Sequence, residues 1–252
     1  MKTSLLKPLL AAILTLGLFA PARAETEIYR PYSALIREAV AKAGTDEVTA
    51  ALEIIGAADG LSASGVAARI KHELPQIDPR ATVRVLDEVL ANIVREGEEY
   101  RRLCAALQPL TSFLGLEGRI HVVIFRSEVP VVALSPPNGL MVSTRVLALL
   151  SDGELRAVVA HELCHLPLTE VFRAAVDAKD YRTMRLIELF CDAGAVAVTA
   201  ARGEAPSLLI KGLSRMQQVL ELEFGETGRK GKHPTLAERA RLVKKLSRRL
   251  LS

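Results

Sequence analysis

Two histidines and a glutamate form the most chemically informative pattern in the chain, His161-Glu162-Leu163-Cys164-His165. Residues four apart lie one above the other on a helix face, so His161 and His165 can hold one metal ion. Glu162 would then lie beside the open coordination position, where a carboxylate can take a proton from metal-bound water. A chance match arises in roughly one such sequence per hundred, so two ordinary surface histidines are the alternative.

A catalytic zinc site needs a third protein ligand and an open fourth position. Glu188 and Asp192 are again four residues apart, in a stretch that is apolar nearly all round. Two carboxylates in such surroundings need a strong partner, which disfavours a solvated acidic face. We therefore expect Glu188 to complete a zinc site with His161 and His165, with one ion per chain. Asp192 would accept the second ring N–H of a ligand histidine and fix its tautomer.

The spacing of apolar residues, and the Gly and Pro residues that interrupt it, predict the helices and strands that position these residues. Helices are expected over residues 32–43, 46–57, 64–74, 81–107, 181–202, 207–224 and 236–251. Ser151 and Glu154 have capping-box spacing, which predicts the start of the helix that carries His161, and Pro167 is expected to stop it. Small residues after Asp192, among them Gly194, should let the second motif helix approach the first closely.

Short β-branched runs precede the first motif helix. Residues 120–125, 131–134 and 140–143 read as strands, with a turn at 136–139. They predict a small antiparallel sheet packed on that helix, and an α+β fold class that is mostly helical. The expected organisation is a signal peptide at 1–24, a helical N-terminal region at 25–115 and a catalytic core at 116–252.

The region from about Ile120 to Val243 resembles the gluzincin metallopeptidases, the family that includes the CAAX prenyl protease and the heat-shock protease HtpX. In that family a strand and a glycine turn precede a helix of the form ELxxVxAHExxH, and residues 154–165 here read ELRAVVAHELCH. The family's next motif, E-x-x-x-D, is matched by Glu188 and Asp192. The resemblance implies a zincin-like catalytic core.

A third motif of that family is His-Pro followed by an arginine before a final helix, matched here by His233-Pro234 and Arg239. The resemblance implies that His233 and Arg239 line the active site, where they stabilise an oxyanion or orient the ligand carboxylate. A turn histidine and a surface arginine are the alternatives. Many relatives carry membrane helices, whereas no later stretch of this chain is long and apolar enough, so it resembles the soluble, periplasmic branch.

The first residues read as an export signal. Lys2 and Lys7 precede an apolar run at 9–20, and Ala22-Arg23-Ala24 gives small residues at the positions that signal peptidase reads. We expect cleavage after Ala24 and a periplasmic or secreted mature protein, with an uncleaved membrane anchor as the alternative. Cleavage removes three positive charges, which lowers the formal net charge from +4 to +1. The basic pI therefore says little about partners.

The chain has three cysteines, Cys104, Cys164 and Cys191, and an odd count excludes a fully paired disulfide framework. Cys164 and Cys191 lie inside the two motifs. A disulfide between them is one alternative in an oxidising compartment, but two buried free thiols are the favoured interpretation.

These patterns together predict a zinc-dependent endopeptidase that hydrolyses peptide bonds in exported or envelope proteins, with Glu162 activating zinc-bound water. A zinc-stabilised chaperone or scaffold with little proteolysis, and a helical protein that binds no metal, are the alternatives. Peptides or unfolded proteins are the expected partners, and scarce aromatic residues disfavour nucleic acid. The basic helix at 236–251 could contact anionic lipid, although docking of its apolar stripe on the core is favoured.

Overall fold

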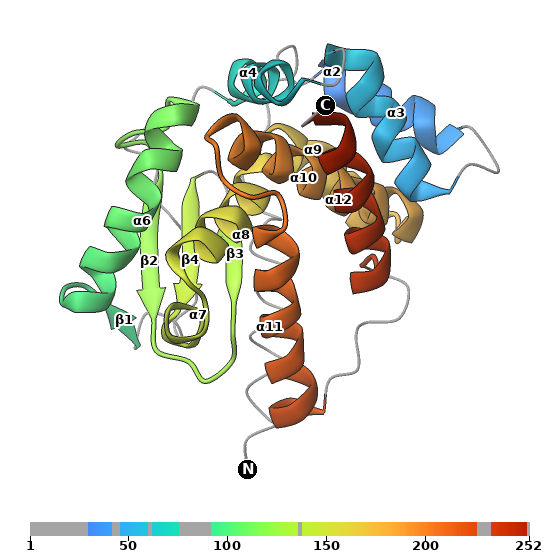
Figure 1. Ribbon diagram of the computed structural model, residues 1–252. Coiled ribbons are helices and arrows are strands. Elements are labelled where there is room, and N and C mark those ends of the chain that lie inside the picture. The colour runs from blue at the N-terminus through green and yellow to red at the C-terminus, as the bar shows by residue number, and fades with distance from the viewer. Residues whose placement is uncertain are drawn as a thin grey trace.

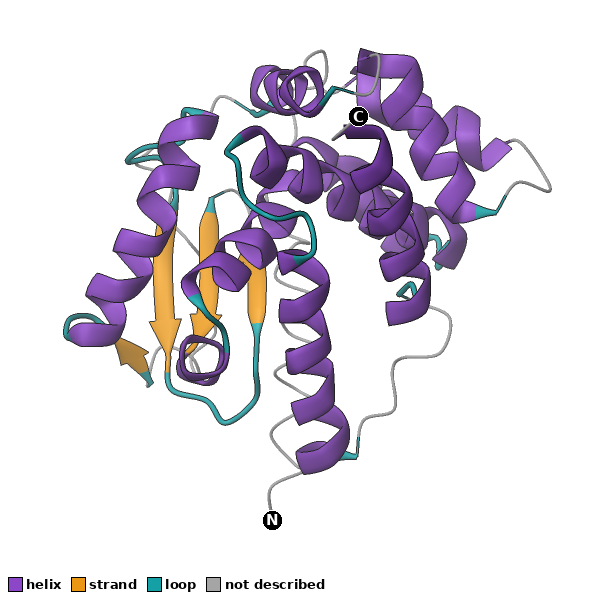
Figure 2. Ribbon diagram, viewed as in Figure 1, coloured by secondary structure: helices purple, strands orange, loops and turns teal. Residues whose placement is uncertain are grey.

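The computed structural model describes residues 30–41, 46–59, 62–75, 92–135, 138–225 and 233–250 of the 252-residue chain. The expected signal peptide at 1–24 lies outside these ranges. Within them, no helix combines the length and the apolar character that crossing a bilayer requires. Helices dominate the described fold and four strands form one small sheet, in agreement with the predicted α+β class (Figure 2).

Helix α10, Tyr181–Ala201, runs through the middle of the molecule (Figure 1). Every residue from Leu186 to Thr199 is buried, as the apolar composition of this stretch predicts. Helices from three parts of the chain pack on it: α2 (Arg30–Ala41), α3 (Glu47–Asp59) and α4 (Ala63–Glu73) from the N-terminal part, α8 (Asp152–Cys164) from the middle, and α12 (Leu236–Leu250) from the C-terminal part. The helix that carries Glu188 and Asp192 is therefore the centre of the core.

The sheet contains β1 (Ile93–Val94), β2 (His121–Phe125), β3 (Val132–Ser135) and β4 (Gly139–Ser143), in the order β1-β2-β4-β3. The three predicted strands are present, but the prediction of an antiparallel sheet was wrong. β4 pairs parallel with β2 and antiparallel with β3, so the sheet is mixed. A hydrophobic run marks a strand without showing its partner, and here consecutive β2 and β3 do not pair. All five residues of β4 are buried, as is usual for a central strand.

The helix predicted over 81–107 was wrong in its middle part. Ile93–Val94 forms the short strand β1, antiparallel to β2, and a new helix, α6 (Glu98–Leu114), begins after Gly97. Gly97 adopts a φ of 112°, a conformation that other residues rarely reach, so the chain turns there before the helix starts. The part of the prediction that covers 81–91 lies outside the described residues.

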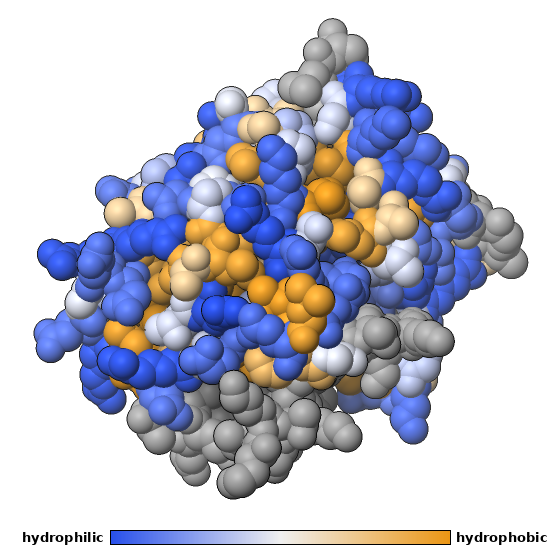
Figure 3. All heavy atoms as spheres, turned by 60° about the horizontal axis from the view of Figure 1, so that its bottom comes forward, coloured by the Kyte–Doolittle hydropathy of each residue, from blue (hydrophilic) through white to orange (hydrophobic). Residues whose placement is uncertain are grey.

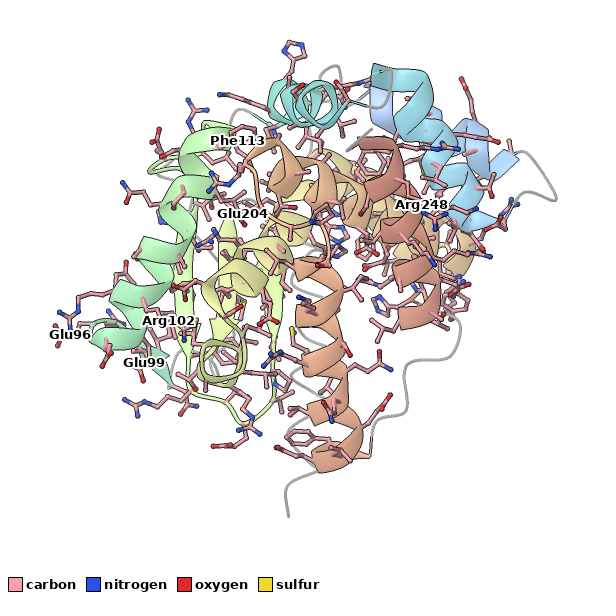
Figure 4. All side chains as sticks on the ribbon, viewed as in Figure 1. Glu96, Glu99, Arg102, Phe113, Glu204 and Arg248 are labelled. Atoms are coloured by element: carbon pink, nitrogen blue, oxygen red, sulfur yellow. The ribbon has the colours of Figure 1, made fainter. Side chains whose placement is uncertain are left out.

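The start of α8 is fixed by its capping box, as predicted. The Ser151 side chain accepts a hydrogen bond from the backbone N–H of Glu154, and the Glu154 carboxylate accepts one from the backbone N–H of Ser151 at 2.9 Å. Arg102 of α6 reaches the same turn (Figure 4), where it donates to Asp152 at 2.9 Å and to the carbonyl of Leu150 at 2.7 Å. The start of the helix that carries His161 is therefore fixed by its own capping box and by Arg102 of α6.

Two short helices flank α8 that the sequence patterns did not reveal. α7 (Thr144–Leu149) begins directly after β4, because the buried hydroxyl of Ser143 caps it by accepting from the N–H of Val146. After α8, Pro167 lies inside a 3₁₀ turn, η2 (Leu166–Leu168), which leads into α9 (Thr169–Asp177). Both helices have fewer than ten residues, so their periodicity is too brief to recognise.

The last two helices are α11 (Leu208–Phe224) and α12. Leu242, Val243 and Leu246 of α12 are buried against the core, and Arg248 is exposed on its outer side (Figure 4). The favoured interpretation of the basic segment, an apolar stripe docked on the core, is confirmed. Figure 3 turns the lower end of α11 and of the sheet toward the viewer, where hydrophobic patches alternate with hydrophilic residues.

Close contact between α8 and α10 depends on Gly194, as the small residues there predicted. A Cβ atom at this position would lie 2.7 Å from Sγ of Cys164 and 2.9 Å from Cδ1 of Ile70. Both distances are shorter than the contacts that real Cβ atoms make, so a larger residue at position 194 requires the side chains of Cys164 and Ile70, or the helices that carry them, to shift.

We predict that Gly194→Ala destabilises the fold, by about 1–3 kcal/mol of overpacking, although alanine normally favours a helix over glycine by about 1 kcal/mol. Urea denaturation of the two single variants and of Gly194→Ala/Cys164→Ala measures the effect. Removing Sγ creates space for the new methyl group, so the double variant should lose less stability than the sum of the single losses. Strict additivity would show that the Gly194 position is not crowded by Cys164.

Candidate metal centre

The three predicted metal ligands come together where α8 and α10 pack side by side. Nε2 of His161 lies 3.4 Å from Oε2 of Glu188, and Nε2 of His165 lies 3.7 Å from Oε1 of the same carboxylate. One ligand atom from each residue falls within 4.8 Å of the other two. His161 and Glu188 are buried, so the alternative of ordinary surface residues is wrong for them. The group can bind a metal ion.

The spacing of these atoms can be compared with the requirements of a tetrahedral ion. Bonds of about 2.0–2.1 Å to nitrogen and oxygen place neighbouring ligand atoms roughly 3.3 Å apart. The distances of 3.4 and 3.7 Å from Glu188 to the two imidazoles are close to that value. Two imidazoles and one carboxylate also leave a fourth position, and this donor set suits zinc.

Asp192 lies behind His161, on the side away from the other ligands. Its Oδ1 is 2.8 Å from Nδ1 of His161, within hydrogen-bonding distance, which leaves Nε2 directed to Glu188 and His165. Burial alone would lower the pKa of His161, but Asp192 and Glu188 outweigh it and raise the pKa to about 10. The imidazole is therefore protonated in the metal-free protein, and a bound metal must displace that proton.

Arg239 joins the two carboxylates of α10. Its Nη1 donates to Oδ1 of Asp192 at 3.1 Å, and its Nη2 donates to Oε2 of Glu188 at 2.6 Å. The residue is only 8% exposed, so the alternative of a surface arginine is wrong. Burial would raise the pKa of Glu188, but hydrogen bonds from His161 and His233, together with the charge of Arg239, hold it well below its usual range. Arg239 thus contributes to the ionised state of Glu188 and fixes the orientation of its carboxylate.

The position of Arg239 follows from the way α12 begins. The backbone N–H of Thr235 donates to Oε2 of Glu238 at 2.7 Å, and the N–H of Glu238 donates to the Thr235 hydroxyl at 3.2 Å. This reciprocal capping box fixes the first turn of α12, where Arg239 faces α10. The Thr-x-x-Glu spacing is visible in the sequence, and α12 begins at Leu236, where the sequence analysis predicted it.

His233 lies just before that turn, at the edge of the metal centre. Its Nδ1 is 3.6 Å from Oε1 of Glu188, and its side chain is 35% exposed, which makes it the most accessible imidazole of the cluster. His165 is more enclosed: its ring meets the edge of Phe172 from α9, and burial lowers the pKa of His165 to about 4. A neutral imidazole keeps a lone pair available for a metal.

Glu162 connects the centre to the sheet. Its Oε2 accepts a hydrogen bond from the backbone N–H of Leu134 in β3 at 3.2 Å. Burial raises the pKa of Glu162 to about 7, and the charges of His161, Glu188 and Arg239 also act on it. The sequence could not predict the Leu134 contact, because almost any residue at position 134 would supply the same backbone N–H.

The two cysteines of the motifs do not form a bridge. Cys164 and Cys191 are buried free thiols, as the favoured interpretation predicted. Burial raises the pKa of both well above the usual range of a thiol, so both are protonated at neutral pH. They act as small apolar residues in the α8–α10 contact.

Comparison with models of known protein families, with curated proteins and with solved structures finds no match to this chain.

We predict a graded loss of metal across three variants of the centre. Glu188→Ala removes one of three ligands and should abolish stoichiometric binding, whereas Asp192→Asn, which weakens the support of His161, should lower metal affinity about 10–100-fold. Asp180→Asn, at the start of α10 and away from the centre, is the matched control and should bind normally. Metal analysis and competition with a chromophoric chelator measure all three. Full occupancy of Glu188→Ala would place the third ligand elsewhere.

Proposed function

We propose that the protein is a zinc-dependent endopeptidase. The observation that carries this proposal is the convergence of His161, His165 and Glu188 within 4.8 Å of one another, with the carboxylate of Glu162 beside them. A zinc ion held there would polarise the carbonyl of the scissile bond and make a bound water more acidic. The order of these residues in the chain, with the resemblance of the motifs to gluzincin metallopeptidases, supports hydrolysis of peptide bonds rather than of other substrates.

Glu162 is the proposed general base. A carboxylate with a pKa near the working pH accepts a proton readily and also gives it up again, and burial raises the pKa of Glu162 to about 7. The residue would take a proton from the attacking water and pass it to the departing amine. The hydrogen bond from the N–H of Leu134 restrains the orientation of its carboxylate.

The charges around the centre also support this chemistry. Glu188 and Asp192 are neutralised in part by one guanidinium, that of Arg239, in a buried setting. A divalent ion added to these groups leaves an excess of positive charge once His161 has released its proton. Such a site stabilises the negative oxygen that develops on a carbonyl under attack. His233, the most accessible imidazole, is placed to contribute a donor to that oxygen.

The proposed substrates are peptides or unfolded proteins outside the cytoplasm. This part of the proposal rests on the signal-like residues 1–24 in the sequence and on the motif resemblance. A mature N-terminus at Glu25, determined by mass spectrometry of protein recovered from the envelope or the medium, would support export. Retention of residues 1–24 would support an anchored form instead.

We predict that Glu162→Gln folds and keeps its metal but loses hydrolysis. The amide preserves the shape of the side chain and cannot accept the proton, so kcat should fall by about 10²–10⁴-fold. Cleavage of casein or a fluorogenic peptide, beside metal analysis, measures this. Glu170→Gln on the exposed side of α9 is the matched control and should be fully active. If the unaltered protein binds metal but shows no cleavage that a chelator inhibits, the result would favour the alternative of a zinc-stabilised scaffold.

We also predict an acid limb in the pH profile. Glu162 works only when it is deprotonated, so kcat/KM should rise as the pH increases and reach a plateau at or below about pH 7, since a metal cation nearby lowers the pKa of a carboxylate. At pH values below the working pKa of Glu162, kcat/KM should fall by up to tenfold for each unit by which the pH is lowered. Rates measured at constant metal occupancy test this. A rate that declines steadily from pH 5 to pH 7 would remove Glu162 from the role of base.

A further inference from the structure

Arg185 connects the metal-binding helix to the segment that carries His233 and Arg239. It lies on α10, one turn before Glu188, and its side chain is only 16% exposed. Nη1 donates to the backbone carbonyl of His233 at 3.0 Å, and Nη2 donates to Oε1 of Glu238 at 2.6 Å. One side chain therefore holds both the loop before α12 and the first turn of that helix.

A third partner comes from the N-terminal helices. Oε1 of Glu47, the first residue of α3, lies 3.6 Å from Nε of Arg185. Asp46, its neighbour, pairs with Arg241 of α12 at 2.7 Å. The planar guanidinium of arginine can contact three acceptor groups at fixed angles, whereas the ammonium of lysine, on a flexible side chain, cannot. The geometry of this contact thus requires arginine at position 185.

The partners of Arg185 are the groups that determine where the residues of the metal centre lie. The carbonyl of His233 fixes the backbone from which its imidazole reaches Glu188. Glu238 forms the capping box of α12, and the next residue, Arg239, bonds the carboxylates of Glu188 and Asp192. Arg185 itself contacts none of the predicted metal ligands in the described structure.

We propose that Arg185 is a positioning residue, which holds His233 and Arg239 against the Glu188 carboxylate and is itself oriented by Glu47 of α3. The proposal rests on the proposed function for its catalytic consequence, but its effect on the ligand carboxylate concerns metal binding alone. It assigns the N-terminal helices a part in the metal centre, although none of their residues lies among the predicted ligands.

The role differs from a general contribution to stability. The later turns of α12 dock through Leu242, Val243 and Leu246, all buried, and do not involve Arg185. Loss of the Arg185 contacts should therefore release the His233 loop and the first turn of α12, while the helix stays on the core. The expected consequence is a misaligned Glu188, not an unfolded protein.

The test compares Arg185→Gln and Arg185→Lys with Arg182→Gln. Arg182 lies on the same helix and also donates to a backbone carbonyl, that of Val40 in α2, so it is a matched control. We expect Arg185→Gln to lower zinc affinity and kcat about tenfold each, with KM unchanged, and to alter the visible spectrum of the cobalt(II)-substituted protein. Arg185→Lys keeps the positive charge but lacks the planar set of N–H donors, so its zinc affinity and kcat should lie between those of Arg185→Gln and the unaltered protein. Arg182→Gln should match the unaltered protein in all three measurements.

A double-variant series tests the proposed route through His233. If Arg185 acts by placing His233 and Arg239, then Arg185→Gln/His233→Ala should lose less kcat than the product of the two single losses. Glu47→Gln removes the support from α3 and should show a smaller effect of the same kind, which keeps the proposal testable if Arg185→Gln does not fold.

The outcomes separate this inference from the proposed function. Unaltered zinc affinity, kcat and cobalt spectrum in both Arg185→Gln and Glu47→Gln would overturn the positioning role, whatever the protein hydrolyses. Fully multiplicative losses in the double variant would overturn the route through His233. A protein that binds zinc, responds to Arg185→Gln in its cobalt spectrum and cleaves no peptide would retain the positioning role and reject the peptidase.

Discussion

The described structure is organised around two carboxylates that are buried in the middle of an apolar helix. Burying these two carboxylates, Glu188 and Asp192, without partners would be unfavourable, because taking charges out of water costs several kcal/mol per ion. His161 from α8 and Arg239 from α12 supply the compensating groups, at 2.8 Å and 2.6 Å from the nearest carboxylate oxygens. The packing of α8 and α12 on α10 is therefore determined by charge as well as by apolar contact.

Much of the fold could be predicted from local signals. Capping residues, Gly and Pro punctuation and periodicity located most helices, because each of these acts within a few residues of the chain. The strand directions could not be predicted in the same way. β4 lies between β2 and β3. The residues of a short apolar run do not indicate which strand it will pair with, or whether the pairing will be parallel or antiparallel. Ile93–Val94 was missed since two residues are too few for an alternating pattern.

The candidate metal centre was predictable to the extent that its residues lie on single helices. The spacing of His161 with His165 and of Glu188 with Asp192 is a property of helix geometry, so each pair could be placed before their contact was known. Arg239 required the motif resemblance, because its approach depends on a separate helix. The contacts of Arg185 and the amide of Leu134 could not be foreseen, since they depend on how distant segments meet.

The distribution of these residues along the chain has a consequence for biosynthesis. His161 and His165 leave the ribosome before Glu188, and Arg239 follows 51 residues after Glu188, in a helix that must still fold back onto α10. A nascent chain that ends before α12 lacks the guanidinium that bonds the carboxylates of Glu188 and Asp192. A product truncated there would carry the histidine motif without that support for Glu188.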